Sequence, residues 1–257
     1  QFAHEQIGSQ LAPALASSPL LMGKLMSLEA VGLSAQPRLL CLSGHASKRD
    51  VTECQAMVLE LERHGMELDY LDGPFETPTA LDPTIQDQIP GPFYVWSDAP
   101  RGRPSRETLR AGVEHVLRYV ASHGPFDGIY GFSNGGLIAA LATEAMEQAL
   151  AAGGGSAASP VPVFQELGAP APWRFVILAC GSCILEEEGE RQKLRTPSLH
   201  LVGAKDQILA RSLRLREMFE ISDLYEMPYA GHCVPIACIE DLELKAALKL
   251  FFGTLRG

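Results

Sequence analysis

One serine lies in a sequence pattern that is typical of a catalytic nucleophile. Ser133 stands within Gly131-Phe132-Ser133-Asn134-Gly135, between a short apolar run and an alanine-rich segment. A turn this sharp from strand to helix needs flanking positions without side chains, and it lifts the serine hydroxyl clear of the sheet at a helix N-terminus. We therefore predict that Ser133 is a nucleophile rather than an ordinary turn serine.

A serine nucleophile needs a base, which is usually a histidine oriented by a carboxylate. Of the seven histidines, His232 alone lies downstream of the serine and in a loop after a predicted strand. Asp206 follows the strand before that one and is the expected orienting acid, although Asp223 and Glu226 are rivals. Asp206 can also cap the helix predicted to begin at Gln207, and the two roles are compatible.

The oxyanion that forms during acyl transfer needs two backbone N–H donors. We expect one from Asn134, which follows the nucleophile, and the other from His45 in the loop Ser43-Gly44-His45 after the first strand. A side-chain role for His45 is a weaker alternative. Because a free imidazole titrates near pH ~6.5, we expect activity to fall on the acid side as His232 takes up a proton.

An alternation of strands and helices positions these residues. Apolar runs predict buried strands, and helical spacing predicts helices between them. This order favours βαβ units and a mostly parallel sheet with helices on both faces, whose chemistry lies at the carboxyl ends of the strands. The strands are expected at 39–42, 66–71, 128–132, 175–179, 198–202 and 223–227, and the helices at 51–61, 109–120, 135–150, 207–219 and from residue 236.

A long proline-rich segment, residues 72–104, interrupts this alternation. Its aromatic residues Phe75, Phe93, Tyr94 and Trp96 are candidates to line an acyl-binding groove at the sheet edge, since long loops often carry function. The alternative is that these side chains fill the core beneath a long loop. If they line a groove, replacing Trp96 with alanine should change chain-length preference more than stability.

Composition excludes several classes of protein. The 257 residues carry 21 basic and 31 acidic side chains, a net charge of −10, without a run of lysine and arginine, which argues against nucleic-acid binding. No apolar stretch reaches the ~18 residues of a membrane-spanning helix. Residues 1–36 are predicted to be an N-terminal extension, and residues 37–257 a single domain. No oligomeric state follows from the sequence.

Six cysteines lie within apolar runs, which does not favour a disulfide scaffold. Cys180 and Cys183 have the spacing of a redox or zinc motif, but no second pair of cysteines or histidines completes four ligands. We therefore interpret them as buried free thiols and expect no metal site. Reduced cysteines, and the lack of a signal-peptide pattern, favour the cytoplasm.

Several motifs together resemble one family of small serine hydrolases, found in fungi and other eukaryotes. They are Ser43-Gly44, Asp72-Gly73-Pro74-Phe75, Gly124-Pro125-Phe126-Asp127-Gly128, the serine motif with Gly136, Pro197-Ser198-Leu199-His200 leading to Asp206, and Gly231-His232-Cys233-Val234-Pro235. The family includes the ovarian-cancer-associated serine hydrolase and fungal thioesterases that release polyketides. The similarity runs from about residue 38 to about residue 250, and it departs from the family at Ser43, where a histidine is usual.

This resemblance implies an α/β-hydrolase fold with little or no cap domain and no cofactor. It implies hydrolysis of a small-molecule carboxylic ester or acyl thioester by the triad Ser133, Asp206 and His232, with the amides of His45 and Asn134 as oxyanion hole. A dedicated thioesterase acting on a carrier-bound acyl or polyketide chain is an alternative, although −10 is unfavourable against an acidic carrier. A non-catalytic binding module is the alternative from another class.

Overall fold

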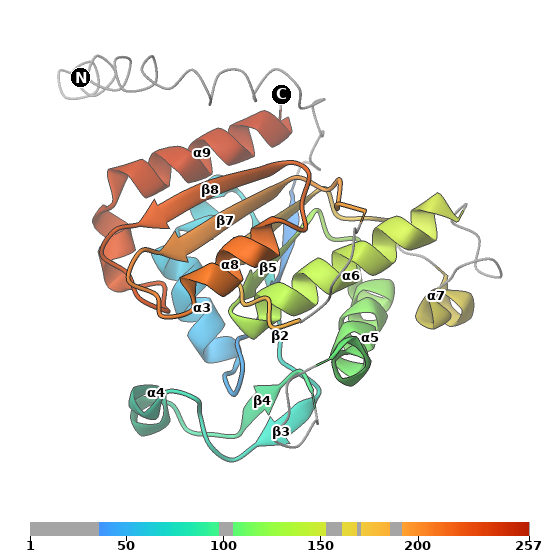
Figure 1. Cartoon of the computed structure of the whole chain (residues 1–257), viewed down its shortest axis with the longest axis horizontal. Coiled ribbons are helices and arrows are strands. Elements are labelled where there is room, and N and C mark those ends of the chain that lie inside the picture. Colours follow the sequence, from blue (N-terminus) through green and yellow to red (C-terminus); the bar gives the residue numbers. More distant parts are fainter. Residues whose placement is uncertain (1–35, 98–104, 153–160, 169–170, 186–191, 257) are drawn as a thin grey trace.

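In the described part of the chain, a sheet of six parallel strands forms the centre of the molecule (Figure 1). The computed structural model describes residues 36–97, 105–152, 161–168, 171–185 and 192–256. The strand order is β2-β1-β5-β6-β7-β8, and every neighbouring pair is parallel. This confirms the predicted sheet. Its strands are β1 (Arg38–Leu42), β2 (Glu67–Leu71), β5 (Gly128–Phe132), β6 (Phe175–Ala179), β7 (Ser198–Gly203) and β8 (Ser222–Met227).

Helices cover both faces of the sheet, as predicted (Figure 1). On one face lie α3 (Arg49–Val58) and α9 (Leu242–Arg256), and on the other α5 (Arg106–His123), α6 (Asn134–Ala151) and α8 (Leu209–Arg216). Successive residues of β1 alternate between the two cores: Leu39 packs with the α3 and α9 side chains, and Leu40 with those of α5 and α6. This alternation follows from the two-residue period of a strand and explains why its residues read as a continuous apolar run.

The helix that follows the nucleophile is buried on nearly all sides. Most of α6 is buried, and small residues such as Ala139, Ala140 and Ala142 let it lie close to the sheet and to α5. The neighbouring helix α5 begins with a capping box, in which Ser105 and Thr108 each accept a hydrogen bond from the other's backbone N–H. The capping box fixes the first turn of α5.

The proline-rich segment contains more structure than the sequence predicted. Strands β3 (Phe75–Thr77) and β4 (Phe93–Val95) pair antiparallel as a small second sheet, and α4 (Pro83–Gln88) lies between them with Asp82 as N-cap. Figure 1 shows this group next to the central domain. Three-residue strands are too short for the alternation of apolar and polar residues to identify them.

The helices near the end of the chain also differ from expectation. The final helix was predicted from residue 236, but Ile236–Glu240 forms a 3-10 helix, η3, and α9 begins at Leu242. The carboxylate of Asp241 accepts the N–H of Leu244, which is the geometry of a helix N-cap and sets this later start. The short elements α7 (Pro162–Leu167) and η1 (Leu61–His64) were not predicted.

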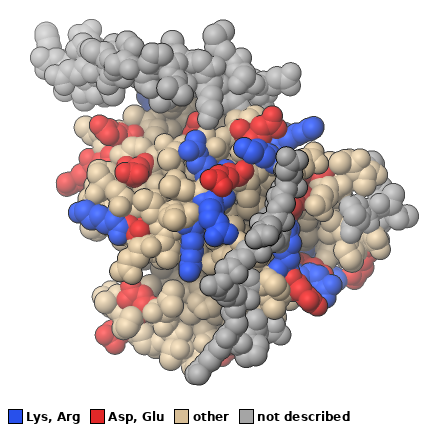
Figure 2. Space-filling model, in the orientation of Figure 1, with Lys and Arg blue, Asp and Glu red and all other residues tan. Residues whose placement is uncertain are grey.

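Charge is spread over the surface without a large patch of one sign on the face that Figure 2 shows, where basic and acidic side chains are mixed. Among the described residues, none of the helices combines the length and apolar character that a membrane crossing requires. The predicted N-terminal extension lies outside the described residues, except for residue 36.

Candidate active site

The turn between β5 and α6 holds Ser133 in a strained backbone conformation, with φ 53° and ψ −116°. The two flanking glycines of the motif are required sterically. A Cβ at Gly131 would lie 2.5 Å from the carbonyl oxygen of Gly135, and a Cβ at Gly135 would lie 2.3 Å from that of Ser43. The peptide of Ser133 is fixed as well, because its N–H donates to the carbonyl of Ala179 at 3.0 Å. This is the geometry of a nucleophile elbow.

Two hydrogen bonds connect the serine to the predicted base and acid. His232 Nε2 lies 2.8 Å from Ser133 Oγ, and His232 Nδ1 lies 2.8 Å from Asp206 Oδ2. A carboxylate only accepts, so Nδ1 carries the ring proton and Nε2 is free to accept from the serine hydroxyl. The structure therefore brings these three predicted residues together.

Asp206 fills the orienting role, but it is not the N-cap of the following helix, which is Ile208. Its Oδ2 bonds to His232, while its Oδ1 accepts the N–H of Ile208 at 2.8 Å, in the turn just before α8 begins at Leu209. Its side chain is 1% exposed, and that of His232 is 29% exposed. The rival carboxylates Asp223 and Glu226 are exposed on β8. The acid is thus buried and fully oriented, and the base still reaches solvent.

The loops that carry the acid and the base touch at a glycine that the sequence analysis did not identify. A Cβ at Gly203 would lie 2.1 Å from the carbonyl oxygen of Gly231 and 2.6 Å from that of Ala230, so only glycine allows this approach. The N–H of Lys205 donates to the carbonyl of Ala230 at 2.9 Å. The ring of Phe132 packs against that of His232 at 5.4 Å. These contacts fix the position of the His232 ring relative to Ser133.

The candidate oxyanion loop, residues 43–47, is fixed at both ends. Trp96 Nε1 donates to the carbonyl of Ser43 at 2.8 Å, and the backbones of Ser47 and Tyr94 exchange two hydrogen bonds of 2.8 and 3.3 Å. His45 lies between these anchors. Asn134 is in the first turn of α6, whose N–H groups have no acceptor within the helix. Both predicted donors therefore come from backbone that is held in place.

The four aromatic residues of the proline-rich segment have different surroundings. Phe93 and Trp96 are completely buried, which fits the core-filling alternative and not a groove. Tyr94 is half-buried, and its backbone forms hydrogen bonds with the backbone of Ser47. Phe75 alone among them lines a cavity of about 570 Å³, together with His45, Pro74, Glu76, Thr77, Val95 and Ser97. This cavity adjoins the candidate oxyanion loop through His45.

A further histidine is buried away from this site. His200 lies within β7, 1% exposed, and its Nε2 is 3.0 Å from Ser198 Oγ. Burial, and secondarily the positive charge of Arg216, lower the pKa of His200 to about 3. A histidine that stays neutral inside the sheet contributes to the core and not to the reaction.

The parallel sheet with a serine at the turn from its central strand to a buried helix defines an α/β hydrolase. Comparison with known proteins agrees. Residues 33–238 match the family described as serine hydrolase (FSH1), and the chain belongs to that family.

Named relatives support this assignment. Mouse esterase OVCA2 is 29% identical over 221 residues, which cover 78% of this chain and 90% of that protein. Hydrolase FUB4 of Fusarium oxysporum f. sp. lycopersici is 35% identical over 105 residues, 40% of this chain and 38% of FUB4. An uncharacterized hydrolase of Schizosaccharomyces pombe is 26% identical over 195 residues, 69% of this chain. The alignments span 38% and 42% of the lengths of the last two proteins.

Solved structures show the same fold. Esterase PE8 superposes with a TM-score of 0.51 and 14% identity, covering 87% of this chain and 96% of that one. A SOBER1 variant of Arabidopsis thaliana gives a TM-score of 0.51 with 17% identity, covering 84% of this chain and 100% of the other. These similarities concern the fold.

Proposed function

We infer that this chain hydrolyses carboxylic esters or acyl thioesters of small molecules through an acyl-enzyme intermediate. Ser133 is the nucleophile, His232 the general base and Asp206 the orienting acid. The observation that carries the proposal is the unbroken pair of 2.8 Å hydrogen bonds from Asp206 through His232 to Ser133.

The reaction proceeds in two acyl transfers. Ser133 Oγ attacks the carbonyl carbon while its proton moves to His232 Nε2, and Asp206 stabilises the imidazolium that forms. The oxyanion of the tetrahedral intermediate accepts from the N–H groups of Asn134 and His45. His232 then protonates the departing alcohol or thiol. In the second half, His232 takes a proton from water as the water oxygen attacks the acyl carbon. The bond to Ser133 Oγ then breaks, His232 returns the proton to Ser133 Oγ, and the carboxylic acid leaves.

The cavity next to His45 is our candidate for the part of the substrate that lies beyond the reacting carbonyl. Phe75 and Val95 supply its apolar surface, and Glu76, Thr77 and Ser97 supply polar groups. A volume of about 570 Å³ is in the range of small-ligand pockets and accommodates a short acyl chain or a compact leaving group. Phe93 and Trp96 are not part of this surface.

Labelling with a fluorophosphonate tests the proposal most directly, since the reagent reacts only with an activated serine. We expect wild type to be labelled and Ser133→Ala to remain unlabelled, with kcat reduced ~10⁶-fold. Ser122→Ala, at an exposed serine on α5, is the matched control and should label like wild type. A panel of acyl esters and thioesters then identifies the preferred bond.

A folded wild-type chain that resists labelling would contradict the proposal and favour a binding module. Preference for carrier-bound acyl chains over free esters and thioesters would instead favour the dedicated thioesterase.

A further inference from the structure

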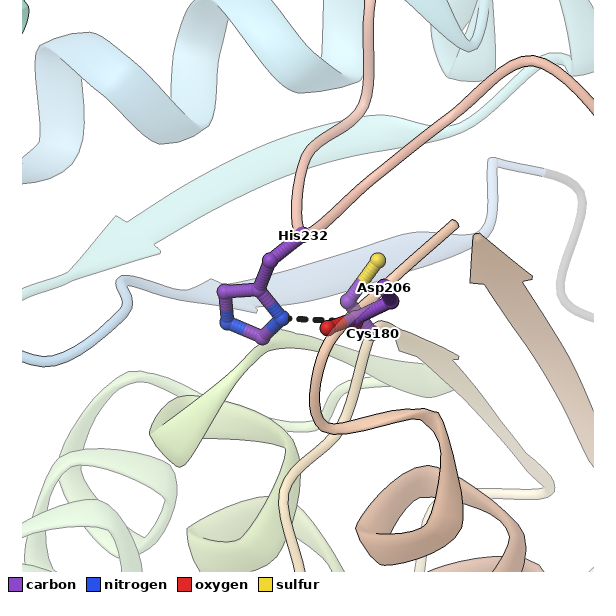
Figure 3. A group of neighbouring side chains, drawn as sticks. All are labelled: Cys180, Asp206 and His232. Atoms are coloured by element: carbon purple, nitrogen blue, oxygen red, sulfur yellow. Dashed lines mark hydrogen bonds and ion pairs between the residues drawn. The ribbon is translucent and has the colours of Figure 1, made fainter. Parts of the chain in front are cut away.

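One cysteine beside the catalytic residues has no part in the mechanism above. The Sγ of Cys180, a carboxylate oxygen of Asp206 and a ring nitrogen of His232 all lie within 4.8 Å of one another. Figure 3 shows the three side chains close together, with a hydrogen bond between Asp206 and His232. They come from the ends of three consecutive strands of the sheet, β6, β7 and β8.

The thiol is held toward the histidine loop by weak contacts only. Its distances to the carbonyl oxygens of Gly231 and Cys233, the two neighbours of His232, are 3.9 and 3.7 Å. Cys180 has φ 48°, in the left-handed region, and its N–H donates to the carbonyl of Leu201 at 2.7 Å. The backbone thus fixes the direction of the side chain toward the histidine loop.

The two cysteines of the Cys180–Cys183 motif do not act as a pair. Cys180 packs in the core on the α3 and α9 side of the sheet, whereas Cys183 packs in the core on the α5 and α6 side. Cys180 lies instead beside Asp206 and His232. Both cysteines are buried free thiols, as predicted, but the sequence did not indicate that Cys180 lies beside Asp206 and His232.

A thiolate, an imidazole and a carboxylate are ligands that Zn²⁺ and Cd²⁺ accept together, whereas Ca²⁺ and Mg²⁺ require oxygen ligands. In a tetrahedral zinc site, neighbouring ligand atoms are about 3.4–3.6 Å apart. Here Asp206 Oδ2 and His232 Nδ1 are 2.8 Å apart. All three ligand atoms lie within 4.8 Å of one another. Small side-chain shifts bring them to the required spacing.

We propose that Cys180, Asp206 and His232 form a three-ligand site for a thiophilic divalent cation of the zinc type, and that its occupation switches off the hydrolase. The inhibitory consequence rests on the function proposed above, but the binding does not. The partly exposed His232 gives the cation a path from solvent. A water molecule or a bound substrate supplies the fourth ligand of the metal.

The binding step balances without an oxidant or reductant. The Cys180 thiol loses its proton to solvent, and the sulfur, Asp206 and His232 Nδ1 each donate a lone pair to the metal. The single proton of the neutral ring then resides on Nε2. A ring protonated at Nε2 cannot accept the proton of Ser133, so the nucleophile loses its base. The inhibition is reversed when a chelator removes the metal.

Cadmium titration of the Ser133→Ala chain measures metal binding at this site and does not require hydrolase activity. We expect one Cd²⁺ per chain, with a thiolate-to-metal charge-transfer band in the ultraviolet. Cys180→Ser should abolish the band and weaken binding at least ~100-fold, in line with the loss of a metal ligand. Cys54→Ser and Cys233→Ser, at the two exposed cysteines, are matched controls that should retain it.

Zinc inhibition of ester hydrolysis provides the second measurement. Each variant is compared with its own metal-free rate, and Cys180→Ser should require at least tenfold more Zn²⁺ for half-inhibition than wild type. A cadmium band that survives in Cys180→Ser, or no band in wild type, would overturn the site. Should Cys180→Ser fail to fold, Asp206→Asn in the Ser133→Ala background must weaken Cd²⁺ binding, and unchanged binding there also refutes it.

Tight Cd²⁺ binding in Ser133→Ala, without zinc inhibition of an active wild type, would overturn the inhibitory role. A chain with no hydrolase activity that still binds Cd²⁺ through Cys180 would contradict the proposed function and leave the metal site supported. The two failures are therefore distinguishable.

Discussion

Replacing Gly135 with alanine tests how the nucleophile turn and the oxyanion loop support each other. The added methyl would lie 2.3 Å from the carbonyl oxygen of Ser43 and 2.9 Å from that of Leu42. Both are backbone atoms, and neither a rotamer change nor a flexible side chain relieves the overlap. The loop that carries His45 must therefore move away from Ser133.

The expected decrease in kcat follows from the size of this displacement. An ordinary Cβ contact is at least 3.4 Å, so the Ser43 carbonyl must retreat by roughly 1 Å, and misplacement of that order lowers rates about 100-fold. If the shift removes one oxyanion donor altogether, kcat falls 10²- to 10³-fold, or about 2.7–4 kcal/mol. We expect kcat to fall within this range with a smaller change in KM, because the donor acts mainly on the transition state.

Steady-state hydrolysis of a soluble ester, measured beside thermal unfolding, separates a positioning effect from loss of the fold. Gly253→Ala is the matched control, since a Cβ there meets no atom within 4 Å and the residue lies inside α9. It should leave kcat unchanged and stabilise by about 0.5–1 kcal/mol. If folded Gly135→Ala has wild-type kcat, the placement of the Ser43–His45 loop against the nucleophile is wrong.

Two further predictions concern buried residues. Trp96→Phe removes the donor to the Ser43 carbonyl and should lower kcat about 10- to 100-fold in steady-state assays, whereas Trp96→Ala should instead destabilise by about 3–5 kcal/mol in denaturant unfolding. For His200, the unfolded chain takes up a proton below pH ~6.5 and the folded chain does not until about pH 3. Unfolding free energy should fall by about 1.4 kcal/mol per pH unit across that window as pH decreases, and His200→Gln should lose this contribution while exposed His123→Gln keeps it. Equal slopes for His200→Gln and wild type would contradict the burial argument.

The strands of the central sheet were predictable because burial on both faces leaves a continuous apolar run. All five residues of β6 are buried, and its bounds at Phe175 and Ala179 are those that the sequence predicted. Short elements carried no such signal. The three-residue strands β3 and β4 lie among prolines, and their pairing is visible only once the chain is folded.

The candidate triad followed from chain order together with the position of each residue after a strand. Ser133 is marked locally by its glycines, and Asp206 and His232 follow strands that end at the same edge of the sheet. The roles of Gly203 and Cys180 were not predictable in this way. Each depends on the close approach of two or three loops that are distant in sequence, and a single sequence does not specify such distances.

The order of the strands also determines which part of the sheet must be intact for Ser133 to be reactive. β5 lies within the sheet, whereas His232 follows β8, which among the described residues pairs with β7 alone and forms an edge. Edge strands open more readily than central ones, since half of their backbone groups lack a strand partner. Separation of β8 from β7 would remove the base while the nucleophile turn stays intact. We therefore expect loss of Ser133 reactivity to report on the stability of the β7–β8 edge, and to precede the unfolding of the remaining strands.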